Sequence, residues 1–132
     1  MSETRMVRVL LVDDNAAIRA GVSALLASTP DLSLVGSCAD GAGAVAAAAA
    51  LVPEVVLMDI SMPGMDGIAA TTALLAAQPS VKVLVLTALA TGDALARAQR
   101  AGALGVVAKA AGPAALLTAL RAVADGCTAW PT

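Results

Sequence analysis

The sequence predicts an α/β protein, doubly wound as (βα)5 around a five-stranded parallel sheet. Short apolar runs rich in β-branched residues recur along the chain, and segments with helical spacing or helical composition separate them. The runs are continuously apolar rather than alternating, which is typical of strands that helices cover on both faces. The chain has 132 residues, the size of one domain.

The predicted strands are the apolar runs flanked by turn-forming or charged residues. Each run is four to six residues long, which suits a buried strand better than a helix. The chain has one Trp and no Phe or Tyr, so Val, Leu, Ile, Met and Ala must fill the core. The predicted strands are residues 7–12, 32–37, 55–58, 81–86 and 105–108.

The predicted helices lie between these strands and after the last one. Three segments repeat apolar residues at helical spacing, namely 18–26, 45–52 and 116–124. Two others, 67–78 and 93–102, are rich in Ala and helical by propensity.

Residues that start and stop helices support the same boundaries. The predicted N-caps are Asn15, Asp66 and Thr91, whose side-chain oxygens can accept hydrogen bonds from unpaired backbone N–H groups. The predicted stop signals are Pro30, Pro53, Pro79 and Gly102. Gly112 and Pro113 open the last helix.

Composition and charge exclude several classes of protein. The net charge of −2 gives no basic face for nucleic-acid binding. The absence of His excludes Ser-His-Asp and Cys-His catalysis and argues against a zinc site. No apolar run reaches the roughly 18–20 residues of a membrane span. With no signal peptide before the first strand, we expect a cytoplasmic protein whose Cys38 and Cys127 stay as thiols.

One domain accounts for nearly the whole chain. The alternating pattern of strands and helices predicts a domain at residues 1–125. The last residues, 126–132 (GCTAWPT), lose that pattern. We expect them to be a frayed C-terminal tail or the start of a linker.

Polar side chains follow four of the predicted strands. Asp13 and Asp14 follow the first strand, and Asp59 follows the third. Thr87 follows the fourth and Lys109 the fifth. Because the carboxyl ends of parallel strands meet at one edge of the sheet, we expect these groups to converge there.

Three neighbouring carboxylates repel each other, and a divalent cation relieves that repulsion. Mg²⁺ prefers oxygen ligands and typically takes one or two carboxylates with a phosphate oxygen. Lys109 can offset the remaining charge. There is neither a Gly-x-x-x-x-Gly-Lys-Ser/Thr loop nor a Gly-x-Gly-x-x-Gly after the first strand, so no nucleotide site is indicated. We therefore expect a phosphoryl group to be accepted by a carboxylate of the protein.

Simpler roles stay open for the same residues. Asp14 could cap a helix, and Asp59 could serve only as an ion-pair partner of Lys109. The second alternative leaves the two preceding acidic residues unexplained. Thr87 alone would be an ordinary strand-end residue, and for Asp66 we expect helix capping rather than a place in the site.

Four motifs in order match a known family. They are LLVDDN, VLMDISMPGMDG, VLVLTA and GVVAK, each at the end of the appropriate strand, and the match covers residues 7–125. In order and spacing they resemble the receiver (CheY-like) domain of two-component response regulators. DISMPGMDG is most similar to the NarL/FixJ subfamily, whose receiver precedes a helix-turn-helix DNA-binding module. The resemblance implies the flavodoxin-like strand order 2-1-3-4-5.

The resemblance also implies a role for each polar residue. Asp59 is similar to the phosphoacceptor, which a sensor histidine kinase phosphorylates. Thr87 resembles the switch hydroxyl and Lys109 the cation that pairs with the phosphate. The implied Mg²⁺ ligands are Asp14 directly, Asp13 through water, Asp59, and the backbone carbonyl of Ser61. The residues implied to shape the loop after Asp59 are Pro63 and Gly67.

The chain departs from the family at Val106. Many receivers have a Tyr or Phe there that rotates inward as the Thr moves, and this chain has neither residue. Val106 is therefore a degenerate aromatic-switch position. Either the signal passes through loop and helix shifts alone, or it is weak.

The expected function is a Mg²⁺-dependent phosphorelay switch that controls transcription through an output domain absent from this chain. We expect a homodimer on phosphorylation, DNA contact only through that output domain, no membrane contact, and no enzyme activity beyond slow self-dephosphorylation. One alternative is an atypical or stand-alone receiver that acts through protein–protein contacts. A Mg²⁺-dependent aspartyl-phosphate hydrolase is less expected, because Ser61 stands where that class has a second Asp.

Overall fold

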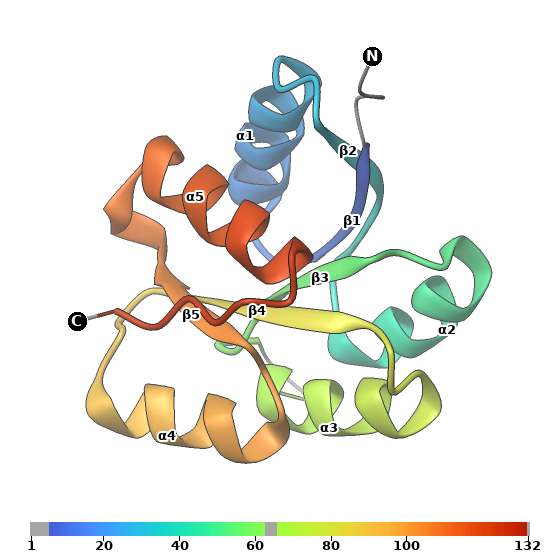
Figure 1. Cartoon of the computed structure of the whole chain (residues 1–132). Coiled ribbons are helices and arrows are strands. Elements are labelled where there is room, and N and C mark those ends of the chain that lie inside the picture. Colours follow the sequence, from blue (N-terminus) through green and yellow to red (C-terminus); the bar gives the residue numbers. More distant parts are fainter. Residues whose placement is uncertain (1–5, 63–65, 132) are drawn as a thin grey trace.

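The computed structural model describes residues 6–62 and 66–131, which form a parallel sheet between two layers of helices (Figure 1). The strands are β1 (Val7–Val12), β2 (Leu32–Cys38), β3 (Val55–Asp59), β4 (Lys82–Thr87) and β5 (Gly105–Ala108). All neighbouring strands are parallel, in the order β2-β1-β3-β4-β5. The predicted fold class and strand order are confirmed.

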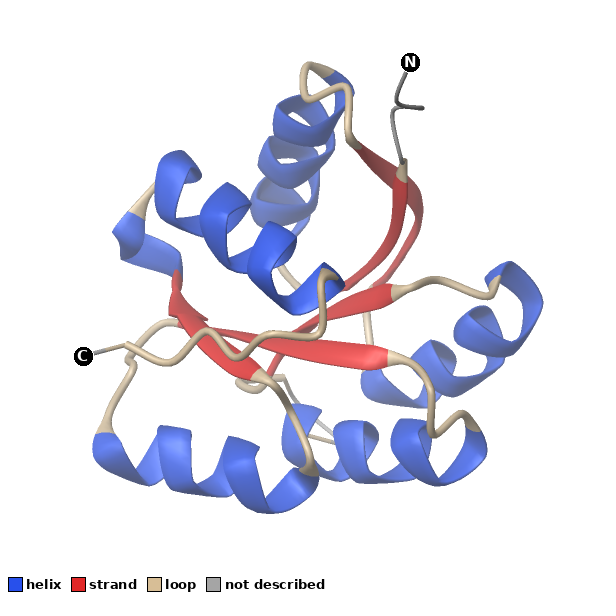
Figure 2. Cartoon of the chain, in the orientation of Figure 1, coloured by secondary structure: helices blue, strands red, loops and turns tan. Residues whose placement is uncertain are grey.

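Helices alternate with the strands along the chain, as Figure 2 shows. They are α1 (Ala16–Ala27), α2 (Gly41–Leu51), α3 (Gly67–Ala77), α4 (Gly92–Ala101) and α5 (Pro113–Ala124). A short 3-10 turn, Lys109–Ala111, separates β5 from α5 and has no counterpart in the sequence prediction.

The sheet has a separate apolar layer on each face. Helices α1 and α5 cover one face, and α2, α3 and α4 cover the other (Figure 1). Successive residues of β3 point into opposite layers: Val55 and Leu57 into one, Val56 and Met58 into the other. All four are fully buried, and burial of each such side chain contributes about 1.5–3 kcal/mol. This explains why the strand reads as a continuous apolar run.

Side chains close the helix N-termini as the sequence predicts. The side-chain Oδ1 of Asn15 accepts hydrogen bonds from the backbone N–H groups of Ala17 and Ile18 in α1. Asp66 and Thr91 accept one each from α3 and α4. Asp40 caps α2 in the same way, at 2.7 Å from Gly43 N. The Ala-rich composition of α2 hid its start, so this cap was not predicted.

The segment after α5 lies along the open edge of β5. Ala129 N donates to Leu104 O at 2.9 Å, and Val106 N donates to Ala129 O at 3.0 Å. Figure 1 shows the tail running beside β5 toward the C-terminus. In residues 126–131 the structure therefore differs from the frayed end expected from sequence. A domain boundary at residue 125 stays a prediction.

Two expectations from composition concern the membrane and the cysteines. Among the described residues, no helix has the length and apolar character needed to cross a bilayer. Cys38 is half-buried and Cys127 is exposed, and both are free thiols.

Candidate functional site

Strand register brings the predicted site residues to one edge of the sheet. β1 pairs with β3 so that Asp13 comes beside Asp59, the last residue of β3. β3 pairs with β4 so that Thr87 lies one step beyond the partner of Asp59. β4 pairs with β5 so that Lys109 directly follows the partner of Thr87. The convergence predicted from the strand ends is therefore present.

The three acidic residues form one cluster. Carboxylate oxygens of Asp13, Asp14 and Asp59 all lie within 4.8 Å of one another. Asp13 and Asp59 have no exposed surface, whereas Asp14 is open to solvent. The cluster thus has a buried side against the sheet and an accessible side through which a ligand could enter.

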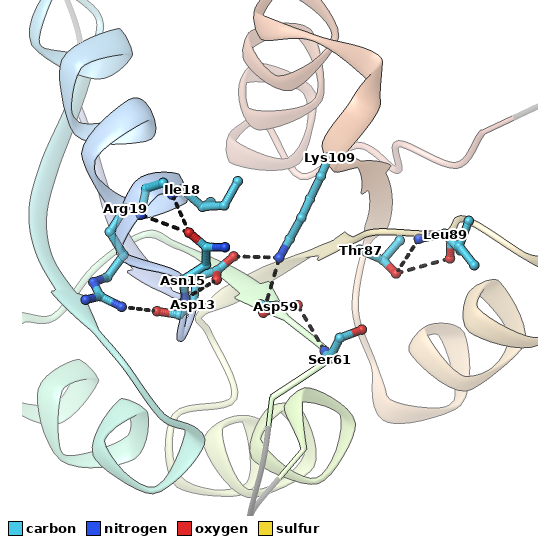
Figure 3. Close-up of polar contacts among 10 residues, drawn as sticks. Asp13, Asn15, Ile18, Arg19, Asp59, Ser61, Thr87, Leu89 and Lys109 are labelled. Carbon is cyan, nitrogen blue, oxygen red and sulfur yellow. Dashed lines mark hydrogen bonds and ion pairs between the residues drawn. The ribbon is translucent and has the colours of Figure 1, made fainter.

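Lys109 bridges the two buried carboxylates (Figure 3). Its Nζ atom lies 3.0 Å from Asp13 Oδ2 and 3.3 Å from Asp59 Oδ2. Burial alone would lower the pKa of Lys109, but the hydrogen bond to Asp13 and the charges of both aspartates outweigh that and raise it. Lys109 therefore holds its proton more tightly than a free lysine does, and Asp59 does form the ion pair considered above.

The two oxygens of Asp59 are in different environments. Oδ1 accepts a hydrogen bond from Ser61 N at 2.9 Å, while Oδ2 faces Lys109. Burial raises the pKa of Asp59, and the negative charge of Asp13 adds to the rise. The Ser61 N–H and Lys109 oppose it without cancelling it. The carboxyl group is therefore harder to ionise than an exposed aspartic acid.

The donor set fits a magnesium ion. Asp13 Oδ2 and Asp59 Oδ2 are buried, and both face the same lysine, Lys109, at 3.0 and 3.3 Å. One lysine shared by a cluster of three carboxylates leaves a net negative charge, which a divalent cation would balance. Mg²⁺ favours carboxylate oxygens and keeps several waters, which the exposed side at Asp14 allows. The Ser61 carbonyl as a further ligand stays a prediction.

Asp13 is held by its backbone as well as its side chain. Its Oδ1 accepts a hydrogen bond from Asn15 N at 2.8 Å. Its backbone carbonyl accepts from Arg19 Nη1 at 2.7 Å, and its backbone N–H donates to Cys38 O at 3.0 Å. The sequence prediction missed Arg19. The available signal was that Arg19 is the one charged residue in an otherwise uncharged α1.

Thr87 lies at the same sheet edge as the cluster without joining it, and Val106 lies further back in β5. The Thr87 hydroxyl donates to Leu89 O at 3.1 Å and accepts from Leu89 N at 3.3 Å (Figure 3). Val106 is buried in the layer under α4. The switch role of Thr87 and the consequences of an aliphatic residue at 106 stay predictions.

The start of α3 presses against the backbone of Asp59. A Cβ atom on Gly67 would lie 2.1 Å from Asp59 O and 2.6 Å from Ile60 Cα. Only glycine permits this approach, which agrees with the expectation that Gly67 shapes the loop. Pro63 lies outside the described residues. Asp66 caps α3 and lies 3.6 Å from Arg97, so it belongs to the helix rather than to the cluster.

Comparison with known proteins identifies the family. Residues 9–121 match the response regulator receiver domain. The chain is 39% identical over 121 residues to the transcriptional regulatory protein LiaR of Bacillus subtilis, covering 92% of this chain and 57% of LiaR. It is 40% identical over 121 residues to the response regulator GacA of Pseudomonas aeruginosa, covering 92% of this chain and 56% of GacA. The chain thus spans little more than half the length of these relatives.

Solved structures agree with this assignment. A LuxR-family response regulator from Aurantimonas sp. SI85-9A1 has a TM-score of 0.88 at 34% identity, covering 94% of this chain and 89% of that one. The isolated receiver domain of RcsB from Salmonella enterica serovar Typhimurium, solved with the phosphomimetic BeF3-, has a TM-score of 0.87 at 26% identity, covering 96% and 94%. Another RcsB structure contains two dimers bound to two parallel DNAs. This chain belongs to the response regulator receiver family and is a receiver domain of the NarL/FixJ type.

Proposed function

We propose that this receiver is a phosphorylation-operated switch in which Asp59 takes a phosphoryl group from the phosphohistidine of a sensor histidine kinase. The observation that carries the proposal is the state of Asp59 Oδ2. This oxygen is buried, faces Lys109 and lies in a cluster of three carboxylates. Ser61 N holds the other oxygen at 2.9 Å, which leaves Oδ2 as the nucleophile.

The transfer is an in-line displacement at phosphorus. The bond from Asp59 Oδ2 to phosphorus forms as the phosphorus–nitrogen bond breaks, and the electrons of that bond return to the imidazole of the kinase. Asp59 must be ionised, and Lys109 favours its ionised form. A magnesium ion held by Asp13, Asp14, Asp59 and the Ser61 carbonyl would supply further positive charge against the transferring group. Lys109 then pairs with a phosphoryl oxygen.

The phosphorylated state changes the loop after β4. A phosphoryl dianion is a stronger hydrogen-bond acceptor than the Leu89 carbonyl that now accepts from Thr87. The Thr87 hydroxyl therefore moves to the phosphoryl group and the 88–91 loop follows it. Slow attack of water on the acyl phosphate returns the domain to its resting state.

The output of the switch is transcriptional control through a domain outside this chain. This chain covers 57% of LiaR, which is named a transcriptional regulatory protein, so the remaining part of such a protein has room for a DNA-binding module. The RcsB receiver was solved with a phosphomimetic, and RcsB dimers bind DNA. By analogy, we assign this receiver a sensor kinase as partner and a homodimer on phosphorylation.

Mass spectrometry after incubation with Mg²⁺ and acetyl phosphate tests the proposal. The chain is expected to gain one phosphoryl group, and omission of Mg²⁺ or the substitution Asp59→Asn is expected to prevent the gain. Asp66→Asn is the matched control, because Asp66 caps a nearby helix and is kept out of the cluster. It is expected to gain the group normally.

Each other result names a different function. Addition that persists in Asp59→Asn would place the phosphoryl group elsewhere and contradict the proposal. Rapid turnover of small phosphate esters would indicate the aspartyl-phosphate hydrolase. No addition to the folded wild-type chain would indicate a receiver that works through protein–protein contacts without phosphorylation.

A further inference from the structure

The tail after α5 is docked on β5 by specific backbone contacts. Cys127 N donates to Ala122 O at 2.9 Å and turns the chain back from the end of α5. Ala129 then uses both its N–H and its carbonyl, bonding to Leu104 O and Val106 N. The result is a one-residue parallel bridge between Gly105 and Ala129 on the outer edge of the sheet.

The docking site is shaped for this approach. A Cβ atom on Gly105 would lie 2.5 Å from Ala129 O and 2.9 Å from Ala129 Cβ. Any larger residue at 105 would therefore push the tail off the edge. Ala129 itself packs against the apolar layer under α5. The open edge of β5 is thus occupied by the chain's own continuation, with a glycine placed where the two backbones meet.

Trp130 carries the tail onto the other face of β5. It is half-buried and packs against the apolar layer that α4 covers. It lines one groove together with Ala90, from the loop after β4, and Val106, from β5. Trp130 is the one aromatic side chain of the whole sequence. Its neighbours are small, so the ring is the largest apolar group at this edge.

A short path joins this groove to the phosphorylation site. The loop from Thr87 to α4 is held by the two hydrogen bonds between the Thr87 hydroxyl and Leu89. Leu89 is 72% exposed, so most of its side chain faces solvent. Ala90, the next residue, packs against the same apolar layer as Trp130. Ala90 is three residues after Thr87, so a movement of Thr87 can displace one of the residues that line the groove around Trp130.

We propose that residues 127–131 are a releasable strap whose docking on β5 reports the state of Asp59. The inference rests on the proposed function. When the phosphoryl group draws the Thr87 hydroxyl away from Leu89, the loop moves toward Asp59 and withdraws Ala90 from Trp130. The strap, held by few contacts, then opens locally while the domain stays folded. Phosphorylation thereby frees the segment that leads out of the receiver.

Trp130 fluorescence tests the proposal directly, because no other residue of the chain contributes aromatic emission. The 132-residue chain is incubated with Mg²⁺ and acetyl phosphate, and each sample is divided between intact mass and iodide quenching. We expect a red shift of the emission and about a twofold rise in quenching that follow the phosphorylated fraction. Asp59→Asn is expected to show neither change.

Two variants define the released state without phosphorylation. Gly105→Ala blocks the tail's approach, and Ala129→Pro removes the N–H group that bonds to Leu104 O. Both lie outside the acidic cluster and are expected to accept the phosphoryl group as the wild type does. Each should be red-shifted and readily quenched from the start, with no further change on phosphorylation. Ala129→Pro alters the tail alone, so the test survives a folding defect of Gly105→Ala.

The outcomes separate the strap from the proposed function. Full phosphorylation with unchanged or decreased Trp130 quenching would overturn the strap and leave Asp59 as phosphoacceptor. Absence of phosphorylation would contradict both the strap and the proposed function. The quenching is repeated at a tenfold lower protein concentration. A change that disappears on dilution would come from self-association and would also overturn the strap.

Discussion

The apolar layers of the sheet and the acidic cluster at its carboxyl edge differ in what burial does. Leu57 and Asp59 lie two residues apart in β3, and neither has exposed surface. Leu57 packs in the layer between the sheet and the helices α1 and α5. Asp59 has a raised pKa, and its Oδ2 shares Lys109 with the carboxylate of Asp13. One strand thus holds one residue whose burial is favourable and one whose burial as an anion is unfavourable.

The difference follows from the physics of desolvation. Removing an apolar side chain from water is favourable roughly in proportion to its area. Removing a carboxylate is unfavourable unless partners replace the water. Here Lys109 is shared between Asp13 and Asp59, so one cation faces two buried anions. The apolar layers therefore stabilise the folded state, whereas the acidic cluster destabilises it. A bound cation or phosphoryl group would change the destabilisation that the cluster causes.

Leu57→Ala tests the stabilising half of this comparison and has the largest expected effect. The substitution leaves a cavity among fully buried neighbours, and such changes lower the free energy of unfolding by about 2–5 kcal/mol. Urea denaturation measures the loss. Phosphorylation of the remaining folded protein is expected to persist, since the carboxylates are untouched. A loss below about 1 kcal/mol would contradict the assignment of stability to the layers.

Gly67→Ala tests the contact between the start of α3 and the backbone of Asp59, where the apolar layer meets the acidic cluster. The added methyl group would meet the Asp59 carbonyl and the Ile60 Cα, which are backbone atoms that cannot move aside alone. We expect a loss of about 1–3 kcal/mol in unfolding free energy and a severe loss of phosphorylation by acetyl phosphate. Gly92→Ala is the matched control, because Gly92 also begins a helix and has no atom within 4 Å of the added Cβ.

The control is expected to be neutral or slightly stabilising, because Ala favours helix over Gly. Equal effects of the two substitutions would show that helix starts, rather than contact with Asp59, determine the result. Stability measured by urea and phosphorylation measured by mass are needed together, since Gly67→Ala is expected to change both.

The elements that sequence alone predicted are those set by local pattern. Five continuous apolar runs fixed the strands, and Asn15, Asp66 and Thr91 marked three helix starts. The acidic cluster was predictable because parallel strands bring their ends together. Strand-end position alone therefore placed Asp13, Asp14 and Asp59 within one site.

The features that sequence missed depend on contacts between distant segments. Arg19 donates to the backbone carbonyl of Asp13, and no periodicity reveals which backbone group a half-buried arginine contacts. The tail pairs with β5 through a single residue, too short to produce a strand pattern. Thr87 was placed correctly beside the site, but its bonds to Leu89 follow from the loop geometry. Such features need the coordinates.

Asp59→Asn tests the strained half of the comparison in the absence of metal. The folded-state pKa of Asp59 is raised above the ordinary 3.8. The contribution that the protonated carboxyl group makes to the free energy of unfolding is therefore fully present below about pH 3.8. It is lost as pH rises through the folded-state pKa. Near neutral pH without Mg²⁺, the variant is expected to be more stable than the wild type, by on the order of 1 kcal/mol. Urea unfolding across pH measures the difference.

Two features of that experiment sharpen its interpretation. The advantage of the variant is expected to vanish below about pH 3.8, where Asp59 is protonated in both states. Saturating Mg²⁺ is expected to reverse the order, because an ion that binds the folded wild type stabilises it by mass action. A wild type that is more stable than Asp59→Asn at neutral pH without metal would contradict the idea of a strained cluster.

The ion pair between Asp31 and Arg121 gives the smallest expected effect and the opposite sign of pH dependence. Arg121 donates two hydrogen bonds to Asp31, at 2.8 and 3.0 Å, and thereby joins α5 to the start of β2. The hydrogen bond from Arg121 lowers the pKa of Asp31 below 3.8. The stability that the Asp31–Arg121 ion pair contributes is therefore present above about pH 3.8 and is lost as pH falls through the lowered pKa of Asp31.

Both partners of this pair are exposed, so its contribution is expected to be slight and to weaken further at high salt. A double-mutant cycle of Asp31→Asn and Arg121→Gln in urea measures it at neutral and at acid pH. The coupling is expected at neutral pH only. A coupling that persisted in acid would show that packing, not charge, joins the two side chains. The two aspartates have opposite pH signs because Asp59 is fully buried beside a second carboxylate, whereas Asp31 is partly exposed and bonded to a cation.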